Sequence, residues 1–485
     1  MNPNSENHSN IDNLQADVVI VGGGGAGLAA AVAASERGAK VIVLERRRAL
    51  GGNSAKAGGI FAAESPVQRR LRIDARRDVC FKMQMEYSRY SINPRIFRAF
   101  VDKSGDTVKW LEDKGLKILQ VPPYYPGQIP QTWHTPRHGG ADIIRVLVKS
   151  CRDLNVRWFT QIRGKKLLIS ETGNITGVVA IQKRKPVTII AKSVVIGTGG
   201  YAGNKKLLKE YYPVDVDDLY RVGLPHMGDG IFMATEIGAD TEGLGTLHLT
   251  GPSCADNRTL TGIAAEPNTI WVNKKGERFI DEVAGLKTFI SINAVMRQPD
   301  KLTFTLFDNG IKQFLAEKGF TKGVGSIYRM QKIKPADWQK ELQVQAEKGL
   351  VKISDSWTEI ANWIGADPKV LKATIDEYNA SCDRGHDPIF AKDRMYLKPL
   401  RTPPYYAIKA APVIITTLGG IKINEHMEAL DKQGNPIHGL YAAGNETGGW
   451  QPDTYNIGLA GATFGFAINS GRIAGENAAK YILGG

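Results

Sequence analysis

The opening part of the chain alternates apolar runs with a helix-favouring stretch. Residues 18–21 are four consecutive aliphatic residues, which is the length and β-branched composition of a buried parallel strand. An alanine-rich stretch with high helix propensity covers residues 28–37. A second apolar run over residues 40–44 ends at Glu45. This order of strand, helix and strand predicts a βαβ unit.

Later segments continue this mixed pattern. Residues 93–114 and the segment after Gly140 place apolar residues at helical spacing. Residues 167–191 alternate as two strands, with the turn expected at residues 171–174. Residues 194–196 then repeat the apolar run followed by glycines. Together these elements predict an α/β protein.

Glycines connect the first predicted strand to the first predicted helix. Gly22, Gly24 and Gly27 fit the spacing G-x-G-x-x-G, with Ala26 inside it. In this fingerprint the glycines allow a tight turn, close approach of a pyrophosphate, and close packing of helix on strand. Glu45 follows about 20 residues later, where an acid accepts hydrogen bonds from a ribose. The order predicts a dinucleotide-binding site.

A second glycine-rich loop over residues 49–60 follows this acid directly. With it, the sequence resembles the flavoprotein-subunit superfamily of fumarate reductases and succinate dehydrogenases, which also holds 3-ketosteroid dehydrogenases and tricarballylate dehydrogenase. In that superfamily the loop lies along the pyrophosphate and the flavin edge, so the resemblance implies FAD rather than NAD. The alternative is a structural glycine loop. The candidate contacts are Gly52, Asn53, Ser54, Ala57, Gly58 and Gly59.

Segments further along the chain carry the same resemblance. It implies that the last helix points its N-terminus at flavin N1 and O2, where the helix dipole stabilises negative charge. It also implies noncovalent FAD, because residues 53–54 stand where the respiratory enzymes carry the flavin-linking histidine. The cofactor contacts implied in these segments are Thr198, Gly199, Asp229, Gly444, Asn445, Gly461, Ala462 and Thr463.

The domain organisation follows from where the glycine pattern stops. After Glu242 it disappears, and it returns near Thr416. The resemblance implies a Rossmann-like FAD-binding domain with an inserted α+β capping domain, and the substrate between them. The ranges we expect are a flexible N-terminus over 1–15, the FAD-binding domain over 16–242 and 405–485, and the capping domain over 243–404.

The resemblance to dicarboxylate enzymes breaks at the positions that carry their cations. Fumarate reductases hold two carboxylates with arginines and a histidine, and the matching positions here are Ala265, Thr416 and about Gly458. None is charged, and unpaired carboxylates in a dry site are costly. Fumarate and succinate are therefore disfavoured. Tyr455 offers a neutral alternative, either as a proton donor, as tyrosines serve in ketosteroid dehydrogenases, or only as a neighbouring hydrogen-bond partner.

These features predict an FAD-dependent oxidoreductase that acts on a CH–CH bond next to a carbonyl, with a hydride passing between carbon and flavin N5. The favoured substrate is a neutral or monoanionic cyclic keto compound. The alternatives are a fumarate-reductase-like enzyme of an organic acid, using cations such as Arg137 or Arg278, the flavin subunit of an electron-transfer complex, and a plain NAD-binding protein. The catalytic candidates are Tyr455, His134 and Arg137, with His134 equally readable as loop packing.

Composition adds limits on partners. The net charge of +14 is compatible with nucleic acid, an acidic membrane surface or anionic ligands, but no nucleic-acid motif is present. The basic stretch 68–78 predicts a solvated helical face or a docking face for an acidic redox partner. Four scattered cysteines without C-x-x-C predict no metal site, so the electron donor or acceptor stays unknown. Lacking a signal-peptide pattern or a membrane span, the chain is expected in the cytoplasm.

Overall fold

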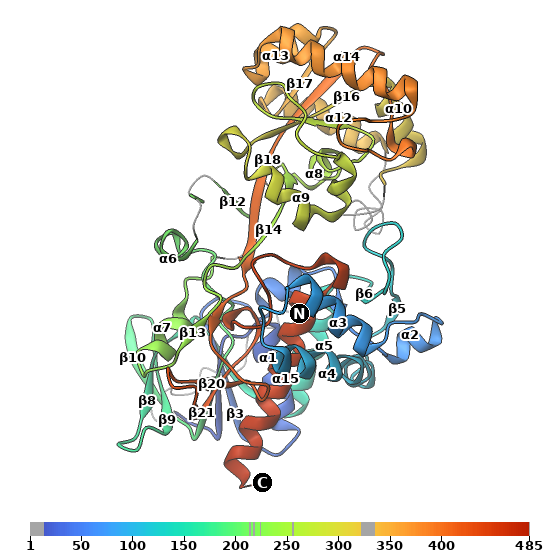
Figure 1. The fold of residues 1–485 in the computed structure, drawn as a ribbon. Coiled ribbons are helices and arrows are strands. Elements are labelled where there is room, and N and C mark those ends of the chain that lie inside the picture. The colour runs from blue at the N-terminus through green and yellow to red at the C-terminus, as the bar shows by residue number, and fades with distance from the viewer. Residues whose placement is uncertain are drawn as a thin grey trace.

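The computed structural model describes residues 14–484 except 213, 214, 217, 218, 224, 255, 256 and 322–334. Residues 1–13 of the expected flexible N-terminus lie outside this part, whereas β1 (Leu14–Gln15) pairs with another strand. The described chain forms two lobes, and the long strand β18 (Tyr405–Thr417) runs from one to the other (Figure 1).

A six-stranded sheet forms the centre of the lower lobe. The pairs are parallel except for β20 with β21, and the predicted apolar runs form its fully buried middle strands. Helical crossovers between such strands place apolar side chains on both faces of the sheet, as the continuous runs predict. The strands in spatial order are β20 (Glu428–Leu430), β21 (Pro436–Ala442), β11 (Ser193–Ile196), β2 (Val18–Val21), β3 (Val41–Glu45) and β7 (Arg157–Thr160).

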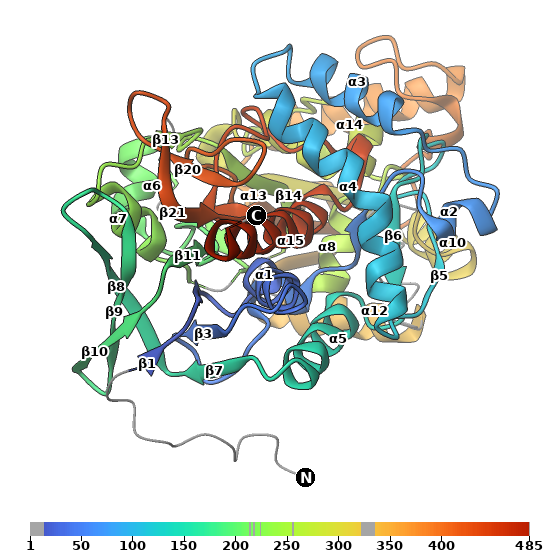
Figure 2. The same cartoon turned by 90° about the horizontal axis from the view of Figure 1, so that it is seen from below.

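The first and last helices cross this sheet together (Figure 2). They are α1 (Gly25–Ser35) and α15 (Ala462–Leu483). A Cβ on Gly471 would lie 2.1 Å from the backbone oxygen of Ala26, and one on Gly475 would lie 2.2 Å from that of Ala30. Glycines in α15 therefore set the distance between the two helices.

Further helices flank this pair. The predicted helices over 93–114 and after Gly140 are present as α4 and α5. The prediction of one helical face over residues 68–78 is wrong in part, because the helix breaks between Arg70 and Arg77 and leaves a turn. The bounds are α2 (Pro66–Arg70), α3 (Arg77–Tyr87), α4 (Pro94–Asp113), α5 (Gly140–Asp153), α6 (Lys205–Tyr211) and α7 (Asp229–Thr235).

A second sheet lies beside the first, in the order β1, β10, β9, β8. The sequence predicts two strands over residues 167–191, but the structure has three: β8 (Ile162–Ile169), β9 (Ile175–Gln182) and β10 (Lys185–Ile190). The predicted turn at 171–174 is present. The second turn was missed because Lys183 and Arg184 lack the usual Gly or Asn signal, although both adopt positive φ.

The upper lobe has its own hydrophobic core, built mainly from residues between Cys254 and Ala410. Strand β18 pairs with four strands there. The strands are β12 (Tyr220–Arg221), β14 (Leu247–Ser253), β15 (Ile270–Val272), β16 (Thr303–Asp308) and β17 (Val351–Ser354). The helices are α8 (Arg258–Ala264), α9 (Thr288–Val295), α10 (Asn309–Lys318), α12 (Pro335–Glu347), α13 (Trp357–Ile364) and α14 (Pro368–Arg384).

Two small sheets complete the fold. The end of the predicted loop 121–136 forms β6, which the sequence pattern did not indicate because tertiary pairing with β4 and β5 sets it. The strands are β4 (Ile60–Phe61), β5 (Ile118–Gln120), β6 (Trp133–Pro136), β13 (Thr241–Glu242) and β19 (Gly420–Ile421). Within the described ranges, every helix is too short or too polar to cross a bilayer.

Candidate active site

One pocket in the lower lobe gathers most of the predicted cofactor residues. It opens where the parallel strands β2, β3 and β11 end, which is where ligands bind in open α/β sheets. The predicted residues that line it are Gly22, Gly24, Ala26, Glu45, Gly52, Asn53, Ser54, Thr198, Gly199, Asp229, Gly444 and Asn445.

The N-terminus of α1 forms one wall of this pocket. Its N-cap, Gly24, has no capping side chain, and a Cβ added there meets no atom within 4 Å. The next amide, Gly25 N, donates to Ser54 Oγ at 3.2 Å. Free amides and the positive end of the helix dipole suit a phosphate group, so this wall fits the pyrophosphate of FAD.

Glu45 has a role in the loop itself. Its carboxylate accepts hydrogen bonds from Gly23 N at 2.9 Å and from Arg47 N at 2.7 Å, and it is buried. A carboxylate has about four lone-pair positions, so two acceptor positions remain for a ribose diol. Glu45 therefore holds the glycine turn in place and still fits the sugar.

Asp229 is held between two arginines that the sequence reasoning did not single out. Arg163 donates to it at 2.6 and 3.1 Å, and Arg46 donates at 3.2 Å. Both arginines line the pocket, as does His226, whose pKa burial lowers to about 4. The arginine run directly after Glu45 was the available signal for Arg46.

Asn445 stands at the opposite wall. Its Nδ2 donates to Thr416 Oγ1 at 3.3 Å, while its Oδ1 is buried without a hydrogen-bond partner among the described residues. A buried acceptor on a pocket wall fits a ligand hydroxyl, which is the role we expect for Asn445 toward the ribityl chain.

The next residue, Glu446, is a buried acid that the sequence reasoning missed. It accepts hydrogen bonds from Thr198 Oγ1 and, at 2.8 Å, from Gly200 N. Burial raises the pKa of Glu446 to about 7. Glu446 supports the cofactor loop around Thr198 from behind, and nothing in its local sequence distinguishes it from a solvent-facing glutamate.

The remaining predicted cofactor residues do not line this pocket. Gly27 packs under Gly22, where a Cβ would lie 1.8 Å from the Gly22 oxygen. Gly58 and Gly59 pack against β6, and Ala57 accepts a hydrogen bond from Gly140. The others, which stand at the start of α15, are Gly461, Ala462 and Thr463.

An aromatic cluster lies at this helix start and joins the two lobes. We define it as Tyr124, His248, Phe289 and Tyr455, all of them buried. Ring centres of His248 and Phe289 lie 4.3 and 4.9 Å from that of Tyr455, and Tyr124 lies 6.4 Å from Phe289. Phe289 comes from α9 of the upper lobe. The cluster therefore forms where cap and cofactor helix meet.

Tyr455 touches the helix start directly. Its hydroxyl accepts a hydrogen bond from Ala462 N at 3.0 Å, and burial raises its pKa to about 12. The phenol is thus neutral and keeps its one proton to donate. The structure places this predicted catalytic candidate beside the predicted flavin contacts.

His248 is the second polar member and was missed by the sequence reasoning. It lies across the β14–β18 pair from Thr416, the position where the fumarate reductases carry their histidine. Its Nε2 is buried without a partner among the described residues, and burial lowers its pKa to about 3. His248 therefore offers a hydrogen bond without charge.

The other two catalytic candidates lie elsewhere. His134 is fully buried in β6, and both ring nitrogens contact protein groups: Ser65 Oγ at 2.6 Å and the Thr132 oxygen at 2.9 Å. Neither nitrogen is available to a substrate in this structure. Arg137 is exposed on the loop before α5. We assign neither to the aromatic cluster.

Arg278, the other cation proposed to hold a carboxylate, is already paired. Its guanidinium donates to Glu282 at 2.9 Å and to Asp387 at 3.0 Å, and all three side chains are buried. Lys392 completes this group at 3.0 Å from Glu282. The four charges balance, so Arg278 has no charge left for a dicarboxylate.

Comparison with known proteins places the chain in a family. The model of the FAD binding domain family matches residues 17–457, and the chain belongs to this family. A vinyl phenol reductase of Lactiplantibacillus plantarum is 31% identical over 446 residues, covering 89% of this chain and 90% of that protein. A probable fumarate reductase of Shewanella frigidimarina is 30% identical over 443 residues, covering 89% of this chain and 69% of that protein.

A solved structure agrees with these matches. The open conformation of a flavocytochrome c3 fumarate reductase has a TM-score of 0.76 at 28% identity, covering 97% of this chain and 79% of that chain. The predicted resemblance, the α/β fold and the FAD cofactor are confirmed. The chain is an FAD-dependent oxidoreductase acting on CH–CH or C=C groups.

Proposed function

We propose that this enzyme reduces a carbon–carbon double bond conjugated to a ring, in a substrate with at most one negative charge, and that its FAD is noncovalent. The observation that carries the proposal is the uncharged aromatic cluster at the start of α15. When bound there, the flavin would supply a hydride to the substrate carbon. The pocket walls at Gly24, Glu45 and Asn445 would hold the rest of the cofactor.

The aromatic cluster favours a flat ring. Offset and edge-to-face contacts with aromatic side chains stabilise a ring by about 0.5–1.5 kcal/mol each beyond burial. By its name, the relative from L. plantarum acts on vinyl phenol, which is an alkene on an uncharged phenol ring. A cyclic enone presents a similar flat ring, so the predicted keto substrate stays a candidate.

The charges around the cluster limit the charge of the substrate. The exposed Lys287 lies at its edge, with Nζ 5.1 Å from the ring centre of Tyr125. His248 is neutral at pH 7 because burial lowers its pKa to about 3. One cation at the rim can offset one anionic group, whereas a second carboxylate buried in the cluster would stay unpaired.

Tyr455 is the proposed proton donor. Its hydroxyl accepts from Ala462 N, which fixes the oxygen and leaves the proton directed to another partner. Positioned proton transfer contributes about 10²–10⁴-fold to a rate. His248, whose ring lies against Tyr455, would orient the substrate by a hydrogen bond from or to Nε2.

The test is anaerobic reoxidation of the photoreduced holoenzyme, which requires no electron partner. Vinyl phenol or a cyclic enone should restore the oxidised flavin absorbance, and fumarate should not. Equal or faster reoxidation by fumarate would overturn the proposal. No reoxidation by any alkene would favour the alternative of a flavin subunit that works only in a complex.

Variants separate the roles of the residues. Tyr455→Phe should lower the reoxidation rate at saturating substrate by about 100-fold, since it removes the proton and little else. Phe289→Ala should raise the substrate concentration needed for half the maximal rate. The matched control is Tyr481→Phe, which alters an exposed tyrosine of α15. A Tyr455→Phe enzyme as fast as this control would remove Tyr455 from the mechanism.

A further inference from the structure

Half of the net charge of the chain is concentrated in one sheet. Residues 157–192 contain eight lysines and arginines and one acidic residue, a net charge of +7 within a total of +14. They form β7, β8, β9, β10 and their connections. This concentration was not visible in the sequence reading, which found its densest basic stretch at residues 68–78.

The strand register shows which side chains point outward. Leu167, Val178 and Ile189 pair across the three strands and are buried, so they face inward. Their neighbours Lys166, Val179 and Thr188 form the next row and face out. We call this outer side of β8–β10, with its tip at Lys183–Lys185, the basic sheet face. No helix lies over it in either ribbon view (Figures 1 and 2).

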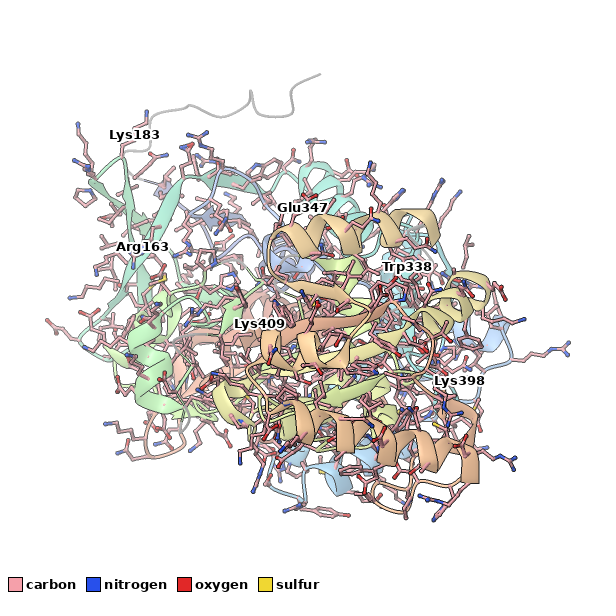
Figure 3. All side chains as sticks on the ribbon, turned by 90° about the horizontal axis from the view of Figure 1, so that it is seen from above. Arg163, Lys183, Trp338, Glu347, Lys398 and Lys409 are labelled. Atoms are coloured by element: carbon pink, nitrogen blue, oxygen red, sulfur yellow. The ribbon has the colours of Figure 1, made fainter. Side chains whose placement is uncertain are left out.

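Most charges of the basic sheet face are uncompensated. Lys165, Lys183, Arg184 and Lys185 are exposed, and none forms an ion pair with a described residue. Lys166 lies 3.8 Å from Glu236, and both side chains are more than half exposed. Figure 3 shows Lys183 at the outer edge of the molecule, across from Lys398 of the upper lobe.

By contrast, the arginines of the stretch 68–78 are mostly paired. Arg70 lies 2.6 Å from Glu112, Arg76 lies 3.2 Å from Asp74, and Arg77 lies 3.2 Å from Glu64. That stretch is close to neutral once its neighbours are counted, and it does not support the docking face that the sequence suggested.

The basic sheet face also exposes aliphatic groups. Ile190 is 48% exposed at the end of β10, and Ile169 is 46% exposed at the end of β8. Pro186 is exposed between the lysines and Thr188. Lysines around aliphatic side chains are the composition of surfaces that lie at the boundary between headgroups and acyl chains.

We propose that the basic sheet face binds the surface of membranes that contain anionic phospholipids. Each lysine or arginine near such a surface contributes about a fivefold gain in partitioning. Two other occupants fit less well. A nucleic acid would call for stacking aromatics, and the exposed apolar groups of this face are aliphatic.

An acidic electron carrier is the other occupant considered. The sheet meets the pocket through Ile162, Arg163 and Gly164, beside Glu45 and Asp229. This is the end of the pocket proposed for the nucleoside, whereas the aromatic cluster lies at the start of α15. A carrier docked on this face would approach the wrong end of the cofactor for electron exchange.

The test compares vesicle binding of the holoenzyme and two triple variants. Lys183→Glu, Arg184→Glu and Lys185→Glu together should lower the affinity for vesicles of equal parts phosphatidylglycerol and phosphatidylcholine by at least about 100-fold. The control is Lys348→Glu, Lys369→Glu and Lys409→Glu, which makes the same charge change at exposed lysines of the upper lobe. It should keep most of the binding.

Salt and lipid composition complete the test. Binding of the unaltered enzyme should fall steeply between about 0.05 M and about 0.5 M salt, and should be absent on pure phosphatidylcholine vesicles. Retained FAD absorbance shows that each variant is folded. Equal losses in the two triple variants, no vesicle binding, or tighter binding to duplex DNA than to vesicles would each overturn the proposal.

Discussion

At the scale of single residues, the cofactor pocket joins two kinds of group. Gly24, Glu45 and Ser54 act through local spacing, so a short stretch of sequence was enough to predict them. Glu446 and His248 act through neighbours that are distant in the chain, Thr198 and Thr416 among them. Sequence alone therefore located the glycines of the pocket and missed its buried polar groups.

Glu446 gives a prediction about stability and pH. Burial raises its pKa from 4.5 to about 7, so the folded state holds a proton that the unfolded state releases. Stability contributed by this group therefore falls as pH rises from about 4.5 to about 7. The loss amounts to about 3 kcal/mol.

Glu446→Gln should remove this loss, because glutamine does not ionise and can still accept from Gly200 N. Urea unfolding at about pH 5 and at about pH 8 measures it: the free energy of unfolding of the unaltered enzyme should drop relative to Glu446→Gln. Parallel pH profiles for the two proteins would mean that Glu446 is ionised in the fold across this range.

At the scale of elements, the contact between α1 and α15 sets the geometry of the pocket. Ala26 lines the pocket on one side and touches Gly471 on the other. The glycine spacing in α15 was visible in the sequence, but its partner helix was not, because the two helices lie more than 400 residues apart in the chain. The three-stranded sheet was underestimated for a related reason, since its second turn lacks a composition signal.

Gly471→Val should disrupt this contact. A Cβ would lie 2.1 Å from a backbone oxygen that cannot move away independently of α1, so we expect a loss of about 3 kcal/mol in the free energy of unfolding, together with weaker FAD binding. Lys480→Val, at an exposed position of the same helix, should cost below about 1 kcal/mol. Equal stability of the two variants would show that α1 and α15 adjust freely.

At the scale of the whole molecule, FAD is expected to connect parts that otherwise touch little. The pocket is lined by α1, β8, η1 (Gly52–Lys56) and η5 (Gly444–Glu446), which come from three separate stretches of the lower lobe. Each hydrophobic core is mainly within one lobe, and β18 contributes to both.

Removal of FAD should therefore destabilise the lower lobe. Restoring FAD at about 100 times its dissociation constant should raise the free energy of unfolding by about 2.7 kcal/mol. Riboflavin, which lacks the pyrophosphate and adenosine, should give a much smaller increase, because it cannot reach the α1 amides or Glu45. An equal increase with riboflavin would contradict the assignment of this pocket to the pyrophosphate and nucleoside.

The arrangement of the pocket also has a consequence for synthesis. Its first wall, at Gly24, leaves the ribosome 421 residues before its last, at Asn445. At ~5–20 residues per second, the βαβ unit waits about 20–80 s for α15 to cover it. Its apolar α1 is exposed throughout that interval, so a nascent chain offers chaperones a binding site before it offers FAD one. Cofactor insertion is therefore a late event, which follows the completion of the last helix.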